Sequence, residues 1–337
     1  MTTTEPLHTT TAPRIASEVA LVDLGRWRNG DEFDRRAIER QVDTALRQVG
    51  FFIVVNHGIA DDTIEDLRAA CADVFALPPA TKARFRQHAG IGSPGWIPIG
   101  SEANAYASGQ VAPPDLKEAW TVGDMAEGAV TPTSRGTIPV VNVFPDDVPG
   151  FEPSVRRYLD AGLELSAELF VLLAAAAGQP ADTFTRLCSR PLHNLNLTWY
   201  PPLVDGDEVV PPAPGQFRIG PHADFGTITV LHREPSDPPL QVQVPDGEWK
   251  DLPHVPDSFI VNVGDQLAYW SAGRWRSNPH RIPAPTGDAA RSGRLSLVLF
   301  VETDLGAMLQ PLGRPELEPL DAVSFLTSKL AAIDTAL

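Results

Sequence analysis

The chain has 337 residues, of which 43% are hydrophobic and 21% charged, so it can bury a full-sized core and is not disordered as a whole. Its net charge of −16 argues against nucleic acid or an anionic membrane as the main partner, because both require basic patches. There is no apolar run of membrane-spanning length and no secretory leader pattern, and Cys71 and Cys188 make neither a disulfide framework nor a cysteine-rich metal site. We expect a cytoplasmic protein and, from its size, an enzyme.

The first half of the chain has largely helical patterning. Apolar residues at helical spacing predict helices over residues 31–48, 62–75, 153–177 and, near the C-terminus, 321–334. The second helix has Asp62 and Glu65 placed as a capping box. The run FFIVV (51–55) predicts a buried strand, and the Thr-rich residues 1–13 are expected to be a mobile tail.

The second half is rich in short β segments separated by Pro and Gly turns. These are LNLTWY (195–200), TITVLH (227–232), LQVQV (240–244), FIVNV (259–263), HRIPA (280–284) and RLSLVLFV (294–301). Regular short strands predict a jelly-roll core, so the fold class is α+β or mainly β, with a double-stranded β-helix flanked by N-terminal helices and a long supporting helix. The expected division is a tail (1–13), an N-terminal mixed domain (14–125), a connecting segment with the long helix (126–190), the jelly-roll core (191–305) and a C-terminal helical segment (306–337).

One pair of polar residues suggests a metal site. His222 and Asp224 stand two positions apart in GPHADFGTITVL, so an extended segment would point both to the same face. One further histidine would complete a set of two histidines and one carboxylate, which leaves metal positions open to substrate and dioxygen. His280 is the favoured third ligand because it opens a strand, whereas His254 lies in a loop between prolines. His232 is expected to end the same strand as the pair and to point away from it. The alternative is a surface strand that merely carries a His and an Asp.

Two strands offer polar groups for an anion. Arg294 and Ser296 share one face of the last strand, and a buried guanidinium needs an anion, which it can hold in fork geometry if that anion is a carboxylate. The alternatives are an ion pair with a structural acidic residue or an arginine that reaches the surface. Thr198 and Tyr200 lie on a polar face of the strand over 195–200, which suits a second anchor for the same ligand; a solvated edge strand is the alternative.

Together these segments resemble the isopenicillin N synthase-like branch of the Fe(II)/2-oxoglutarate-dependent oxygenases. The segments that carry the resemblance are VALVDL (19–24), VGFFIVVNHGI (49–59), GWIPIGSE (95–102), DLKEAWTVG (115–123), WYPP, HADFGTITVL, VNVGDQLAYWSAGRWRSNPHRI (261–282) and the Arg-x-Ser strand, which arrive in the family's order. The resemblance implies an enzyme that uses Fe(II), 2-oxoglutarate and O2 to oxidise, in the expected case hydroxylate, a small molecule with release of succinate and CO2. It also suggests a role in specialised metabolism such as antibiotic biosynthesis.

The resemblance assigns roles to residues of this chain. It implies iron ligation by His222, Asp224 and His280, and binding of the distal carboxylate of 2-oxoglutarate by Arg294 and Ser296, with Tyr200 and Thr198 beside them. It also implies substrate contacts, for which the candidates are Trp96, Ile97, Tyr106, Asn194, Phe225, Trp270 and Phe300.

The chain departs from the family pattern in two places. Thr198 stands where many members carry an Asn, so that contact is missing. The loop PTGDAARSG lengthens the spacing between His280 and Arg294, which makes Arg291 a second candidate anchor, although only Arg294 has a serine two residues on.

Other activities stay open. Within the family they are an oxidative cyclase that needs no 2-oxoglutarate and an enzyme that fragments 2-oxoglutarate to ethylene; outside it, a barrel that binds small carboxylates or metal without turnover. Asp224 argues against the halogenase variant, which leaves the carboxylate position to a halide. The sequence identifies neither the substrate nor the oligomeric state.

Overall fold

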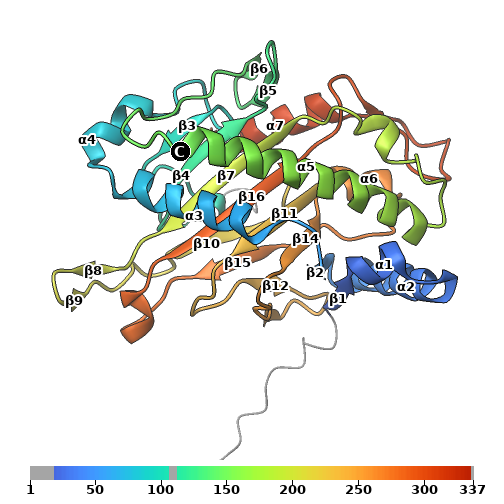
Figure 1. Ribbon diagram of the computed structural model, residues 1–337, viewed down its shortest axis with the longest axis horizontal. Coiled ribbons are helices and arrows are strands. Elements are labelled where there is room, and N and C mark those ends of the chain that lie inside the picture. Colours follow the sequence, from blue (N-terminus) through green and yellow to red (C-terminus); the bar gives the residue numbers. More distant parts are fainter. Residues whose placement is uncertain (1–18, 106–111, 335–337) are drawn as a thin grey trace, which may run out of the picture.

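The computed structural model describes residues 19–105 and 112–334, and two facing β-sheets form its centre (Figure 1). The larger sheet contains, in spatial order, β1 (Ala20–Asp23), β2 (Phe51–Val55), β14 (Phe259–Val263), β11 (Ile228–Arg233), β16 (Arg294–Val301), β7 (His193–Tyr200), β4 (Glu118–Gly123) and β3 (Gly95–Ile97). The smaller sheet contains β10 (Phe217–His222), β15 (His280–Pro283), β12 (Gln241–Gln243) and β13 (Trp249–Asp251). These sheets form the jelly-roll core that the sequence predicts.

The remaining elements surround the two sheets. Three hairpins pair β5 (Val130–Thr133) with β6 (Gly136–Pro139), β8 (Val204–Asp205) with β9 (Glu208–Val209), and β17 (Met308–Leu309) with β18 (Leu320–Asp321). The helices are α1 (Leu24–Asn29), α2 (Glu32–Gln48), α3 (Asp61–Ala76), α4 (Pro79–Lys82), α5 (Phe151–Ala176), α6 (Asp265–Trp270) and α7 (Ala322–Asp334), with short 3₁₀ turns at Ala83–Phe85, Thr185–Leu187 and Gly287–Arg291.

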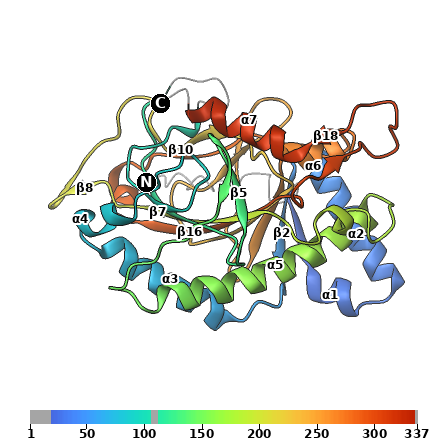
Figure 2. The same cartoon turned by 90° about the horizontal axis from the view of Figure 1, so that it is seen from above.

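The long helix α5 supports one face of the larger sheet. It packs against α2, α3 and β16, and Figure 2 shows α5 and α7 on opposite sides of the long strands. The approach is close at Gly162, where an added Cβ would lie 2.8 Å from Cδ2 of Leu299 on β16. The main apolar core lies between these helices and the sheet, and a second, smaller apolar cluster lies between the two sheets.

Most of the expected elements are confirmed. The four helices appear as α2, α3, α5 and α7 with ends within two residues of the expected ones, and all six strands of the second half are present. The expected capping box on α3 is wrong. Ala60 is the N-cap and makes no side-chain hydrogen bond, so Asp61 and Asp62 lie inside the first turn, where their charges still favour the helix dipole.

The N-terminal part contributes more than supporting helices. It supplies β1, β2, β3 and β4 to the larger sheet, where β2 pairs with β14 and β4 with β7. The larger sheet therefore combines strands from both sides of the boundaries expected at residues 125 and 190. In the described part of the chain, no helix is both long and apolar enough to cross a bilayer.

Candidate metal centre and cosubstrate pocket

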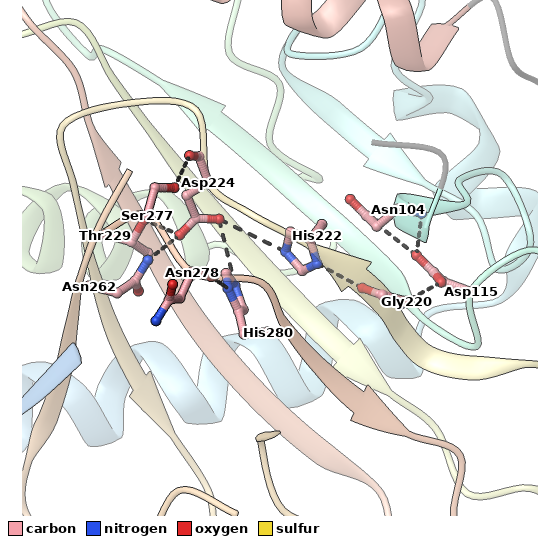
Figure 3. A network of polar contacts seen from close by, with 10 residues as sticks. All are labelled: Asn104, Asp115, Gly220, His222, Asp224, Thr229, Asn262, Ser277, Asn278 and His280. Atoms are coloured by element: carbon pink, nitrogen blue, oxygen red, sulfur yellow. Dashed lines mark hydrogen bonds and ion pairs between the residues drawn. The ribbon is translucent and has the colours of Figure 1, made fainter. Parts of the chain in front are cut away.

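The smaller sheet brings two of the candidate ligands together. His222 ends β10, His280 begins β15, and the two residues are register partners in this antiparallel pair. Asp224 lies in the loop after β10, and its Oδ1 is 3.9 Å from Nε2 of His222 and 3.7 Å from Nε2 of His280 (Figure 3). One ligand atom from each residue falls within 4.8 Å of the others. The three side chains thus converge. The sequence analysis expected His222 and Asp224 on one face of a continuous strand, but β10 ends at His222 and the loop positions Asp224.

Hydrogen bonds orient each of the three side chains. Nδ1 of His222 contacts the Gly220 carbonyl at 2.8 Å, and Nδ1 of His280 contacts the Asn278 carbonyl at 3.3 Å, so both rings direct Nε2 toward Asp224. A histidine that donates from Nδ1 offers the lone pair of Nε2 to a metal. The Asp224 carboxylate is fixed through Oδ2, as described below, which leaves Oδ1 facing the histidines.

The second oxygen of Asp224 accepts two short hydrogen bonds. Thr229 Oγ1 donates to Oδ2 at 2.5 Å and Asn262 Nδ2 donates at 2.6 Å. These two donors are cross-strand partners of β11 and β14, so the larger sheet holds a carboxylate that the smaller sheet's loop presents.

Electrostatics favour the protonation states that a cation requires. Burial, reinforced by His280, lowers the pKa of His222 to about 4, so its imidazole is neutral at pH 7. Burial alone would raise the pKa of Asp224, but the two histidines and the hydrogen bonds from Thr229 and Asn262 outweigh it and hold that pKa below its usual value. Two imidazoles and one carboxylate that share an open side are the donor set of a mononuclear Fe(II) site, so these residues fit that metal.

Arg294 is a buried cation without a carboxylate partner. Only 1% of Arg294 is exposed, and burial lowers its pKa to about 10. Its guanidinium donates to Ser236 Oγ at 2.9 Å and to Ser296 Oγ at 3.2 Å, and it lies 5.3 Å from the ring centroid of Tyr200. Among the residues that the structure describes, no carboxylate forms an ion pair with it. A buried guanidinium whose hydrogen-bond partners are two serine hydroxyls is a site for an anion.

The metal ligands and Arg294 open into one cavity of about 210 Å³. Tyr200, Thr198 and Ser296 line it near the arginine, as expected. The exposed Arg291 does not line it, because its side chain contacts the Asp207 carbonyl and Asp288 at the surface. Of these two arginines, Arg294 is therefore the one that lines the cavity.

The expected substrate contacts fall into three groups. Ile97, Asn194, Phe225 and Phe300 line the cavity. Trp96 and Trp270 do not. Trp96 alternates with Ile97 on β3 and faces the other side, where its Nε1 donates to Glu118 at 2.7 Å, and Trp270 on α6 packs edge-to-face against Phe184 in the main core. Tyr106 lies outside the described residues.

Four other histidines lie outside this cluster. Nδ1 of His57 accepts from the Ile59 N–H at 3.1 Å, and Nδ1 of His193 contacts the Pro191 carbonyl at 2.9 Å, so each of these two rings is engaged with nearby backbone. His232 packs against Phe259, and His254 is exposed. The three-residue cluster of His222, Asp224 and His280 includes none of these four.

Comparison with known proteins decides the family. Residues 19–147 match the model described as the N-terminal region of non-haem dioxygenases in morphine synthesis, and residues 187–303 match the 2OG-Fe(II) oxygenase superfamily. This chain belongs to the 2OG-Fe(II) oxygenase superfamily. It is therefore a dioxygenase that uses Fe(II), 2-oxoglutarate and O2, which confirms the activity and cofactors that the resemblance implies.

Individual relatives support the same assignment. A validamycin A dioxygenase from Streptomyces hygroscopicus subsp. limoneus is 32% identical over 304 residues, which cover 89% of this chain and 81% of the relative. A homoarginine-6-hydroxylase from Arabidopsis thaliana is 27% identical over 281 residues, covering 82% and 79%. Among solved structures, a full-length Neurospora crassa protein in complex with alpha-KG has a TM-score of 0.80 at 25% identity, with 93% of this chain and 96% of that chain covered.

Several residues that line the cavity of this oxygenase escaped the sequence analysis. They are Gln87, Glu102, Asn104, Lys117 and Glu302, together with Leu326, Leu330 and Ile333 from α7. Lys117 and Glu102 form a buried ion pair at 2.5 Å. The usable signal was an acidic or basic residue inside an otherwise apolar stretch, as in the segment LFVET that contains Glu302.

Proposed function

We propose that His222, Asp224 and His280 hold Fe(II) in this oxygenase and that Arg294, with Ser296, binds the distal carboxylate of 2-oxoglutarate. The observation that carries the proposal is the joint presence, in one cavity, of a converging two-histidine, one-carboxylate cluster and a buried guanidinium without a carboxylate partner among the described residues. A dicarboxylic keto acid that reaches from the metal to Arg294 satisfies both.

The protein's residues have distinct tasks in this arrangement. Iron with bound 2-oxoglutarate supplies dioxygen activation, with release of succinate and CO2 and oxidation of a substrate C–H bond. Thr229 and Asn262 hold Asp224 so that Oδ1 points to the metal position. Arg294 and Ser296 fix the far end of the cosubstrate, and Tyr200 lies against the guanidinium and excludes water from it.

The rest of the cavity then receives the substrate. Its wall contains Ile97, Asn194, Phe225 and Phe300, which suits a medium-sized, partly apolar small molecule oriented by a few polar contacts. The named relatives act on validamycin A and homoarginine, so we propose hydroxylation of a small molecule of specialised metabolism as the reaction.

The test is an anaerobic titration of the purified protein with Fe(II) and then 2-oxoglutarate, followed by visible absorption. We expect a weak charge-transfer absorption in the native protein, no iron binding in Asp224→Ala, and iron binding with at least about ten-fold weaker 2-oxoglutarate binding in Arg294→Gln, because a charge-assisted hydrogen bond is lost. Arg291→Gln is the matched control, since it removes an exposed arginine three residues away. Iron binding by Asp224→Ala, or equal losses in the two arginine variants, would contradict the proposal.

A further inference from the structure

Glu302 is a carboxyl group in the cavity wall that the proposed chemistry leaves unused. It follows β16 directly, lies two residues beyond Phe300, and is 8% exposed. Its backbone N–H donates to the Leu192 carbonyl at 2.8 Å, which fixes the main chain at this point. Oε2 of its side chain is buried and accepts no hydrogen bond from any residue that the structure describes.

The other buried carboxylates in the described part of the chain all accept hydrogen bonds. Glu118 accepts from Lys82 and from Trp96 Nε1, and Asp115 accepts from Asn104 and from the Gly220 N–H. Asp224 accepts from Thr229 and Asn262. A buried carboxylate without a donor costs several kcal/mol, and the group avoids this cost by taking up a proton or by meeting a donor or cation that a ligand brings.

The chain also makes room for this carboxyl. A Cβ on Gly226 would lie 2.2 Å from Oε2 and 2.4 Å from Oε1 of Glu302. Gly226 is not in the left-handed region, so its missing side chain serves space and not backbone conformation. Any other residue at position 226 would displace the Glu302 side chain.

No cation of the described chain compensates Glu302. Burial, and after it the negative charge of Asp224, raises the pKa of Glu302 to about 8, and no Lys or Arg opposes the shift. Lys329 is on α7, which lines the same cavity, but its ammonium pairs with Asp265 at 2.8 Å. Without a ligand, Glu302 therefore favours its protonated form at neutral pH, and a cation that would stabilise its carboxylate must come from a ligand.

The rest of the cavity wall indicates the chemical class of ligand that it suits. The cavity wall contributed by α7 is apolar, with Leu326, Leu330 and Ile333, and Phe225 and Phe300 add two aromatic rings. A cation or strong hydrogen-bond donor on an apolar frame matches such a wall, whereas an anion would be repelled by Asp224 and would bring no donor to Glu302.

We propose that Glu302 binds a basic nitrogen of the substrate, so that the substrate class of this oxygenase is an amine on an apolar frame. The proposal rests on the proposed function, because it takes the cavity beside the metal and 2-oxoglutarate to be the substrate site. An ammonium group at Glu302 would orient the rest of the molecule along the wall made by α7 and the two phenylalanines.

The test uses the full-length enzyme loaded with Fe(II) and 2-oxoglutarate in the absence of oxygen. Butylamine, benzylamine and cyclohexylmethylamine are titrated by calorimetry, each beside the alcohol with the same carbon frame. We expect at least one amine to bind about ten-fold more tightly than its alcohol, because a charge-assisted hydrogen bond between an ammonium and a carboxylate is stronger than a hydrogen bond from a neutral hydroxyl. In Glu302→Gln that ratio should fall to about one. Glu127→Gln, which removes an exposed carboxylate outside the cavity, should keep the native ratio.

Each other outcome overturns the proposal. If Glu302→Gln keeps the preference for amines, the nitrogen binds elsewhere, for example on the metal. If the native enzyme shows no preference for amines, its substrate class is not an amine. Loss of the charge-transfer absorption in Glu302→Gln alone would make Glu302 part of the metal site's architecture. Failure of the native protein to give that absorption would instead overturn the proposed function, so the two failures are distinguishable.

Discussion

Asp224 uses its two carboxylate oxygens for different purposes. Oδ2 accepts from Thr229 and Asn262, and Oδ1 faces the two histidines. In the sequence, Thr229 and Asn262 appear only as polar residues within the apolar segments TITVLH and FIVNV. Their common role depends on the register that pairs them across β11 and β14. Residue types and spacing do not determine the register between strands that lie far apart in the chain, so the ligands could be predicted but their supports could not.

Another residue of β11 makes folding sensitive to acid. Burial, with smaller effects from Arg68 and His57, lowers the pKa of His232 to about 4 from an ordinary value of 6.5. Between these two values the unfolded chain binds the proton and the folded protein does not, so stability falls as the pH falls from 6.5 toward 4. The cost for this one group reaches about 3 kcal/mol.

We expect His232→Leu to lose less stability than the native protein between pH 7 and pH 5, as measured by urea unfolding at both values. Leucine keeps an apolar contact with Phe259 and has no proton to gain. A residual slope should persist, since burial also lowers the pKa of His57. Equal pH dependence in variant and native protein would contradict the assignment of this effect to His232.

At the scale of elements, a loop of the N-terminal part holds the end of β10 that carries His222. Asp115 Oδ1 accepts from the Gly220 N–H at 2.9 Å, its Oδ2 accepts from Asn104, and the Gly220 carbonyl contacts Nδ1 of His222 (Figure 3). Both carboxylate oxygens of Asp115 face donors, so an amide at this position would turn its NH2 group toward an N–H.

We therefore expect Asp115→Asn to bind Fe(II) about ten-fold more weakly, through the altered placement of His222, in an anaerobic metal titration. Its thermal stability should fall as well, because two donors then meet in a buried site, so iron binding is compared at a temperature at which the variant is folded. Asp251→Asn is the control, because Asp251 also bridges two strands, accepting from Gln241, but lies outside the cavity. If both variants bind iron as the native protein does, Asp115 has no part in positioning His222.

Long elements were predictable, whereas of the short strands β12 and β15 were predicted and β1 and β3 were not. The apolar period of α2 and α5 runs over many turns, and β16 alternates over eight residues, so each pattern identifies its element. β3 has three residues and β1 has four, too few for a period, and their strand character comes from the neighbours they pair with. Trp96 illustrates the consequence. Because β3 was not predicted, the sequence did not show which face of the sheet Trp96 occupies, and the residue was expected to contact substrate.

On the scale of the whole molecule, the site depends on strands from both halves of the chain. The apolar cluster between the two sheets contains Phe51 and Ile53 from β2 beside Leu231, Leu240 and Ile282 from the second half. On the other side of the larger sheet, Trp120 of β4 and Phe151 of α5 pack together in the main core. The order of segments in the sequence predicts this family fold. That strands from both halves of the chain lie in one sheet is known only from their pairing in the structure, of β2 with β14 and of β4 with β7.

This shared sheet predicts that the protein unfolds as one unit. Residues 191–305 on their own would lack β2 against β14 and β4 against β7, leaving two open strand edges and the apolar face that α5 covers. We expect that fragment to show little native strand content by circular dichroism and to bind no iron, and the full chain to unfold with coincident transitions by circular dichroism and tryptophan fluorescence. A folded, iron-binding fragment would instead show that the jelly-roll core is independent, and the N-terminal strands would then be an addition to a barrel that is already complete.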